Sequence, residues 1–189
     1  MAAETPLVVG VDLSGDPAVG EWSTWEPALL LAHAKGLPVT LHFAELPGRA
    51  SEGRSMLAFA PERLGHAVRV DPALESELLA TRIPVEVCLT SNLKTQSVAT
   101  LGEHVCARLL RAGHPVALCT DDSGVFDTTL SAEFLMAAEA FGLSRRALFE
   151  FSLGSLEHAF LPEGLKESLR GHFLVAAARL GVATPGGDA

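Results

Sequence analysis

The sequence predicts an α/β protein built on a parallel sheet. Short apolar runs rich in β-branched residues alternate with polar loops and helical stretches about five times, which is the pattern of strands joined by crossover helices. The chain shows no internal repeat and no low-complexity block, and its 189 residues fit a single domain. Polar residues cluster where the apolar runs end, which is where parallel α/β folds place their active sites.

Two architectures are compatible with this pattern. A complete (β/α)₈ barrel takes about 250 residues, so about five strands followed by extra helices fit only a partial barrel. A five-stranded doubly wound sheet fits the length of the chain better. Length alone therefore favours the doubly wound sheet, whereas the motifs at the strand ends favour the partial barrel.

Each element is expected from its local pattern. Apolar runs bounded by turn-forming residues predict strands at residues 7–13, 38–43, 64–68, 83–89 and 115–119. Apolar residues at helical spacing, several times closed by Gly, predict helices at 25–35, 51–60, 72–80, 100–112, 129–141, within 144–160, and at 161–180. We expect a polar loop at 90–95, a disordered N-terminus at 1–6, and a frayed tail at 183–189.

The charge balance argues against a protein that binds nucleic acid. The net charge is −9 and the isoelectric point is near 5.2, whereas binding to a duplex needs a basic face. No apolar run approaches the roughly 20 residues of a membrane span, and the start of the chain lacks the features of a signal peptide. We therefore expect a small-molecule partner, with no nucleic acid and no membrane.

The three cysteines, Cys88, Cys106 and Cys119, do not predict a disulfide framework. Their number is odd and no Cys-x-x-Cys pair occurs. Two of them lie inside apolar runs and are expected to be buried free thiols. Free thiols are typical of a reducing compartment, so we expect a cytoplasmic protein.

Charged and imidazole side chains stand at the ends of three predicted strands. Asp121 and Asp122 follow the apolar run at 115–119, and His42 lies at the end of the second strand with Glu45 three residues later. His66 belongs to the third strand. Two adjacent carboxylates at the end of a buried strand must be paired, hydrogen-bonded or bound to a cation.

Each of these residues also has an ordinary structural explanation. A lone His42 is more often a hydrogen-bonded core residue than a ligand, Glu45 resembles a solvated surface residue, and Asp is a common helix N-cap. If they converge at the carboxyl ends of the strands, however, two imidazoles and three carboxylates can hold a divalent cation and transfer protons. A catalytic zinc usually takes three protein ligands. Only His42 and Asp121 are obvious candidates, so the third is either His66 or a residue outside this chain.

Five motifs in order resemble those of the adenosine deaminase family. They lie at residues 8–16, 41–45, 63–66, 86–92 and 119–126, and the resemblance extends over about residues 7–180. The form Cys-Leu-Thr-Ser-Asn at 88–92 is most similar to the adenosine deaminase-like branch, which deaminates N6-methyl-AMP. Five ordered motifs are a specific signal, which any one of them alone is not.

The resemblance implies a zinc-dependent hydrolase of the purine C6 position on a (β/α)₈ barrel. His42 and Asp121 would be zinc ligands. Glu45 would donate a proton to the purine ring, and His66 would orient the zinc-bound hydroxide. The expected cofactor is therefore Zn²⁺, and the expected substrate is a purine nucleotide or nucleoside.

Two further residues are implied in substrate binding. Asp122 would contact the purine, and Gly15 would offer a backbone group to its edge. The family takes two more zinc ligands from a His-x-His pair on its first strand, and this sequence has no such pair before Leu7. The resemblance therefore covers strands four to eight and the terminal helices, over residues 7–182, as expected of a truncated isoform, a truncated gene model or a fragment.

Three hypotheses follow for the chain itself. The first is a purine deaminase that binds zinc poorly and has little activity alone, because half of the ligands are missing. The second is a catalytically silent chain that acts, if at all, by association; the family barrel is expected to be monomeric, but an open half-barrel is prone to self-association through bare sheet edges and exposed apolar residues. The third is a magnesium-dependent hydrolase on a doubly wound sheet, with Asp121 and Asp122 as oxygen ligands.

Overall fold

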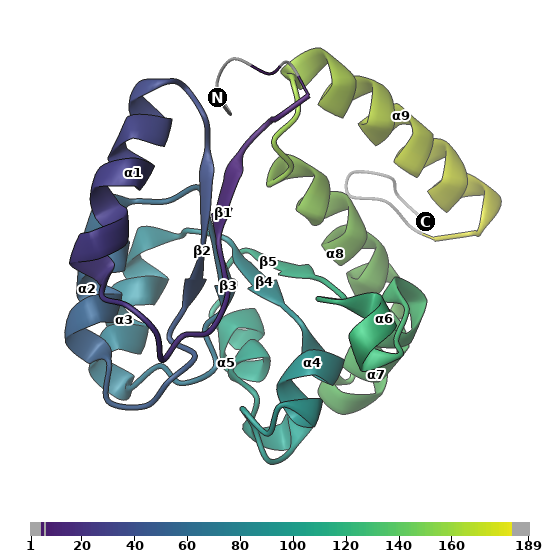
Figure 1. The fold of residues 1–189 in the computed structure, drawn as a ribbon. Coiled ribbons are helices and arrows are strands. Elements are labelled where there is room, and N and C mark those ends of the chain that lie inside the picture. The colour runs from purple at the N-terminus through teal and green to yellow at the C-terminus, as the bar shows by residue number, and fades with distance from the viewer. Residues whose placement is uncertain (1–4, 6, 183–189) are drawn as a thin grey trace.

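The computed structural model describes Thr5 and residues 7–182 (Figure 1). The disorder expected at 1–6, apart from Thr5, and the frayed tail expected at 183–189 lie outside the described residues. Within the described part, one parallel sheet carries helices α1, α2 and α3 along one side and helices α8 and α9 on the other, as Figure 1 shows.

The sheet has five strands in the order β1-β2-β3-β4-β5. They are β1 (Val11–Leu13), β2 (Val39–Phe43), β3 (Arg63–His66), β4 (Val85–Val87) and β5 (Val116–Leu118). Every neighbouring pair is parallel. A doubly wound sheet reverses its strand order at a switch point, whereas a barrel adds each strand beside the previous one. The sequential order therefore settles the choice in favour of part of a barrel.

The helices mostly follow the predicted ranges. They are α1 (Trp22–Ala34), α2 (Ala50–Phe59), α3 (Pro72–Thr81), α4 (Leu89–Lys94), α5 (Val105–Arg111), α6 (Ser123–Phe126), α7 (Leu130–Phe141), α8 (Arg145–Glu157) and α9 (Glu163–Arg179), with a 3₁₀ helix η2 (Leu101–Glu103). No helix in the described part of the chain is both long and apolar enough to span a membrane.

The prediction of a loop at 90–95 is wrong, because α4 occupies this segment. Its short polar residues do not favour a helix interior on their own. The first turn is instead stabilised by Glu133 of α7, whose carboxylate accepts a hydrogen bond from the Thr90 N–H at 3.2 Å. Glu133 is fully buried, so this contact is available only in the folded protein.

Among the other predicted boundaries, two change most. The first strand begins at Val11 and not at residue 7, because its first pairing bond joins the Val11 N–H to the Pro38 carbonyl where β2 approaches. The helix expected at 100–112 begins only at Val105. His104 adopts an extended backbone there and caps α5 by accepting the Cys106 N–H on its ring Nδ1.

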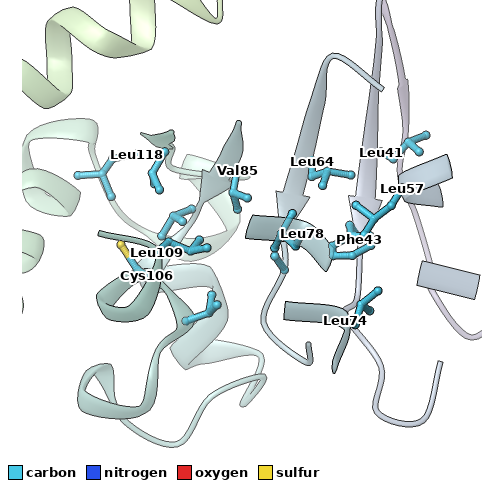
Figure 2. Packing of buried hydrophobic residues seen from close by; sticks show 14 of the residues in the cluster. Leu41, Phe43, Leu57, Leu64, Leu74, Leu78, Val85, Cys106, Leu109 and Leu118 are labelled. Atoms are coloured by element: carbon cyan, nitrogen blue, oxygen red, sulfur yellow. The ribbon is translucent and has the colours of Figure 1, made fainter. Parts of the chain in front are cut away.

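The core lies between the sheet and the surrounding helices (Figure 2). Leu41 and Phe43 of β2 and Leu64 of β3 are fully buried, near Leu74 and Leu78 of α3. A second group joins β4 and β5 to α5 through Val85, Leu109, Cys106 and Leu118. All three cysteines are free thiols; Cys88 and Cys106 are buried and Cys119 is half-buried.

The two edge strands differ in exposure. Asp12 of β1 is exposed and Val11 is only half-buried, so this edge is open as expected. The expectation of a second bare edge is wrong for β5, because Val116, Ala117 and Leu118 are buried. Helices α7 and α8 pack against β5 and cover its apolar residues.

Arg63 of β3 contacts both neighbouring strands and the segment that follows α8. The Arg63 Nε lies 2.9 Å from a carboxylate oxygen of Glu86 on β4 and donates to the Thr40 hydroxyl at 3.1 Å. Its Nη1 donates to the His158 carbonyl, and its guanidinium carbon lies 3.7 Å from the centre of the Phe160 ring. Arg63 therefore holds the C-terminal end of α8 against the sheet.

Candidate active site

The six site residues predicted from the sequence lie around one cleft of about 610 Å³ at the carboxyl ends of the strands. They are Gly15 after β1, His42 and Glu45 at β2, His66 at β3, and Asp121 and Asp122 after β5. Because all five strands are parallel, their carboxyl ends meet at one edge of the sheet. This shared edge is why residues far apart in the sequence converge.

Unusual backbone conformations mark the positions where strands lead into the cleft. His66 has a φ of 63° and Asp121 a φ of 57°, both in the left-handed region that non-glycine residues rarely adopt. Gly15 has a φ of 128°, which L side chains rarely adopt. Local strain of this kind gathers at functional sites in proteins.

His42 contacts Glu45, and its ring occupies space that is free because the residue opposite it is a glycine. Its Nδ1 lies 3.4 Å from a Glu45 carboxylate oxygen. Its register partner is Gly65, where a Cβ would come within 3.2 Å of the His42 ring. Burial lowers the pKa of His42, but the hydrogen bond and charge of Glu45, together with Asp12 and Asp121, outweigh it and leave the pKa raised. The surroundings of His42 therefore favour positive charge.

His66 is almost completely buried and faces two carboxylates. Its Nε2 lies 3.9 Å from Glu45 Oε2 and 4.0 Å from Asp121 Oδ2. Its ring meets the His42 ring nearly edge-on, with 4.6 Å between centroids. Burial is the largest effect on its pKa and lowers it, despite the opposing charge of Glu45. Neutral His66 is therefore the favoured form.

Asp121 is oriented by Ser91. The Ser91 hydroxyl donates to Asp121 Oδ2 at 2.7 Å, and the other Asp121 oxygen accepts the Asp122 N–H at 2.9 Å. Asp122 is exposed at the start of α6, and its side chain makes no capping hydrogen bond there. The capping explanation for Asp122 therefore does not hold, and its carboxylate remains available to the cleft.

The buried residues Asn92, which lines the cleft, and His104 behind it are not among the site residues that the sequence predicts. Asn92 of α4 contacts His66 Nδ1 through its Nδ2 at 3.2 Å, and His104 Nε2 contacts Asn92 Oδ1 at 3.1 Å. Asn92 belongs to the motif at residues 86–92, but the motif alone does not indicate a role for it. His104 lies 38 residues after His66, and nothing in the sequence connects the two.

Comparison with known proteins identifies the family. The model of the adenosine deaminase family matches residues 3–174. This chain belongs to the adenosine deaminase family. The match extends from before β1 into α9, so it includes every strand and the whole of the cleft described above.

Several deaminases are similar to this family member. It is 45% identical over 163 residues to N6-mAMP deaminase of Arabidopsis thaliana, covering 86% of this chain and 46% of that protein. It is 37% identical over 169 residues to N6-methyl-AMP deaminase of Homo sapiens, covering 86% of this chain and 48% of that one. The crystal structure of Arabidopsis ADAL complexed with IMP matches with a TM-score of 0.91 and 42% identity, over 94% of this chain and 53% of that chain.

The structural matches support the assignment to part of a barrel, and they show how much of each deaminase chain this chain covers. A second Arabidopsis ADAL structure, complexed with GMP, matches with a TM-score of 0.90 at 43% identity, over 93% of this chain and 52% of that chain. The chain thus spans about half the length of the deaminases it matches. Because the sheet order is sequential and the neighbours are deaminase barrels, the magnesium enzyme on a doubly wound sheet is not supported.

The donor set of this chain fits a divalent cation. His42, Glu45 and His66 offer three ligand atoms within 4.8 Å of one another, and His66, Cys88 and Asp121 form a second such group. Imidazole and carboxylate are ligands that zinc takes in proteins. The raised pKa of His42, which follows from the carboxylates around it, shows that positive charge is favoured at this point.

The stability of the domain should depend on pH through His104. Burial, with smaller effects of Arg108 and His66, lowers its pKa from 6.5 to about 4. Between these values the unfolded chain binds a proton that the folded chain does not. The neutral state of His104 therefore contributes fully to the free energy of unfolding above pH 6.5. This contribution is lost as the pH falls toward about 4. We expect this residue to lower the free energy of unfolding by about 3 kcal/mol across that range.

Urea unfolding at about pH 7 and about pH 5 measures this effect. His104→Gln should show a weaker pH dependence than the unmodified chain. The exposed His172→Gln is the matched control and should behave like the unmodified chain. If His104→Gln keeps the full pH dependence, His104 does not carry it.

Proposed function

We propose that this chain is a zinc-dependent purine aminohydrolase that removes methylamine or ammonia from C6 of N6-methyl-AMP or a related purine to give IMP or inosine. The main support is the convergence of His42, Glu45, His66 and Asp121 on one cleft. Similarity to N6-methyl-AMP deaminases and to ADAL structures that hold IMP or GMP supports the nucleotide substrate.

His42 and Asp121 are the proposed ligands of the zinc ion. They lie on β2 and just after β5, and Ser91 holds the Asp121 carboxylate by a 2.7 Å hydrogen bond. A bound Zn²⁺ supplies Lewis acidity, which lowers the pKa of a water molecule toward neutrality. Ser91 keeps the Asp121 carboxylate in a fixed orientation, as the partners of metal-binding side chains commonly do.

Glu45 is the proposed proton donor, and its position beside His42 and His66 in the cleft supports this role. The water oxygen bonds to C6 as the Glu45 carboxyl gives its proton to N1 of the purine. One water proton returns to Glu45 and the other passes to the amine nitrogen. The C6–N bond then breaks and methylamine leaves, with a carbonyl at C6 and a proton on N1. A positioned acid of this kind contributes about 10² to 10⁴ in rate.

Gly15 and Asp122 are the proposed contacts to the purine edge. Both line the same cleft as the acid–base residues. Gly15 lines the cleft with a φ of 128°, and it has no side chain that could separate its backbone from a ligand. Asp122 follows Asp121 directly in the sequence and lines the same cleft.

We further propose that the 189 residues alone bind zinc weakly and turn over slowly. Zinc in catalytic sites usually has three protein ligands, and the family assigns only two of them to this chain. Glu45 and Asp121 each keep about a fifth of their side-chain surface exposed, at 21% and 23%. Water in the cleft screens the charges that would stabilise the transition state.

A single-turnover assay tests this function. The purified 189-residue chain, in excess over N6-methyl-AMP and with added Zn²⁺, should form IMP and methylamine slowly, and the two products should appear in equal amounts. Zinc content by mass spectrometry after desalting should fall well below one ion per chain. Rapid multiple turnover would contradict the proposed low activity. The absence of both products and of bound zinc would instead favour a catalytically silent chain that acts by association.

A further inference from the structure

A chain of hydrogen bonds behind the cleft begins at a donor whose identity is certain. The backbone N–H of Cys106 donates to His104 Nδ1 at 3.1 Å. A backbone N–H can only donate, so Nδ1 of His104 must carry a lone pair. A neutral imidazole has one protonated nitrogen, and here it must be Nε2. Burial holds the pKa of His104 at about 4, so the ring is neutral near pH 7.

The proton on His104 Nε2 fixes the orientation of Asn92. The partner of this nitrogen at 3.1 Å is Asn92 Oδ1, which accepts the hydrogen bond. The Asn92 amide nitrogen must then point the other way, toward His66 Nδ1 at 3.2 Å. The backbone of Asn92 is itself anchored, because its N–H donates to the Cys88 carbonyl and its carbonyl accepts from Val98.

The orientation of Asn92 in turn fixes the proton of His66. An amide NH₂ group only donates, so His66 Nδ1 must accept. In neutral His66 the proton therefore lies on Nε2, the nitrogen that faces Glu45 and Asp121 at 3.9 and 4.0 Å. His104, Asn92 and His66 are 0%, 3% and 4% exposed, so water does not compete for these bonds.

We propose that Asn92 and His104 are positioning residues that hold His66 as the Nε2–H tautomer, so that His66 presents an N–H donor to the cleft and not a ligand lone pair. His66 is then not the third metal ligand. It donates a hydrogen bond to an oxygen between Glu45 and Asp121, where the attacking water would lie. The location of the proton follows from the hydrogen bonds alone, whereas its use in catalysis rests on the proposed function.

Replacing Asn92 with aspartate should move the His66 proton from Nε2 to Nδ1, with almost no change in the shape of the side chain at position 92. A carboxylate still accepts from His104 Nε2, but its second oxygen can no longer donate to His66. His66 Nδ1 must then carry a proton of its own. The matched control is Gln96→Glu, which makes the same change from amide to acid at an exposed side chain four residues along.

Nitrogen-15 NMR of the 189-residue chain with labelled histidine rings reads the tautomer directly and needs no turnover. In metal-free protein near neutral pH we expect pyrrole-type Nε2 and pyridine-type Nδ1 signals for His66 and His104. His114, whose Nε2 lies 2.7 Å from the Ile83 carbonyl, serves as an internal reference for the Nε2–H form. The His66→Gln spectrum assigns the His66 signals.

The same spectra, recorded for the two variants and after addition of Zn²⁺, complete the test. In Asn92→Asp the His66 Nδ1 signal should become pyrrole-type, whereas Gln96→Glu should leave it unchanged. Added Zn²⁺ should shift His42 and leave His66 Nε2 protonated. A pyridine-type or zinc-bound Nε2 of His66 in the unmodified chain would overturn the proposal, even if Asn92→Asp does not fold. Failure of the deaminase assay with the expected spectrum would count against the proposed function alone.

Discussion

Replacing Glu45 with glutamine is expected to slow methylamine release from N6-methyl-AMP by about a hundredfold or more. Glutamine keeps the size of the side chain and its ability to hydrogen-bond, but it has no acidic proton to give to N1 of the purine. Glu45 lies 3.4 Å from His42 Nδ1 and 3.9 Å from His66 Nε2, so the substitution acts where the proposed chemistry occurs. Single-turnover rates with the chain in excess over substrate measure the loss.

The matched control is Glu139→Gln, because Glu139 is exposed on α7 outside the cleft. This variant should keep the rate of the unmodified chain. Binding of IMP, measured by calorimetry, should be similar in all three proteins if Glu45 acts on the rate and not on product affinity. A Glu45→Gln rate within a factor of about three of the unmodified rate would remove Glu45 from the role of proton donor.

Replacing Arg63 with methionine is expected to lower the free energy of unfolding by about 2–3 kcal/mol. The substitution leaves the Glu86 carboxylate without its partner at 2.9 Å, and it removes the bond to the His158 carbonyl and the contact with Phe160. Loss of one partner of a buried ion pair typically costs about 3–5 kcal/mol. We expect less here because Arg63 and Glu86 keep 23% and 21% of their side-chain surface exposed.

The pH dependence identifies the cause of this loss. Burial already raises the pKa of Glu86, and Arg63 opposes that effect. Without Arg63 the folded-state pKa rises further above the unfolded value. The penalty is therefore largest at neutral pH and shrinks as the pH falls and Glu86 becomes protonated in both states. Urea unfolding followed by circular dichroism should show this convergence.

The double variant Arg63→Met with Glu86→Gln separates charge from packing. Removing both charges should recover most of the lost stability, because no unpaired carboxylate remains buried. If the double variant is as unstable as Arg63→Met alone, the effect lies in the Phe160 and His158 contacts and not in the ion pair.

The positions of the strands and of the polar cleft residues are predictable from local patterns in the sequence, whereas the role of Gly15 was implied only by the family resemblance. Buried parallel strands need continuous apolar residues, and the polar residues that follow them lie at one edge of the sheet. His42 and Asp121 are 79 residues apart, yet the ends of their strands both lie at that edge. Helix α4 was missed because its polar residues become helical only through the buried Glu133, which lies far along the chain.

The sequence by itself determined the α/β class, the approximate strands, and the chemistry gathered at their carboxyl ends, since these depend on local apolar patterns and short motifs. The family resemblance also predicted part of a barrel, and the sequential strand order confirms it. Only the tertiary structure decided that α7 and α8 cover β5 and that His104 reaches His66 through Asn92. These features depend on contacts between residues that no local pattern connects. Which ring nitrogen of His66 carries the proton depends in the same way on Asn92 and His104, which are neighbours in space and not in sequence.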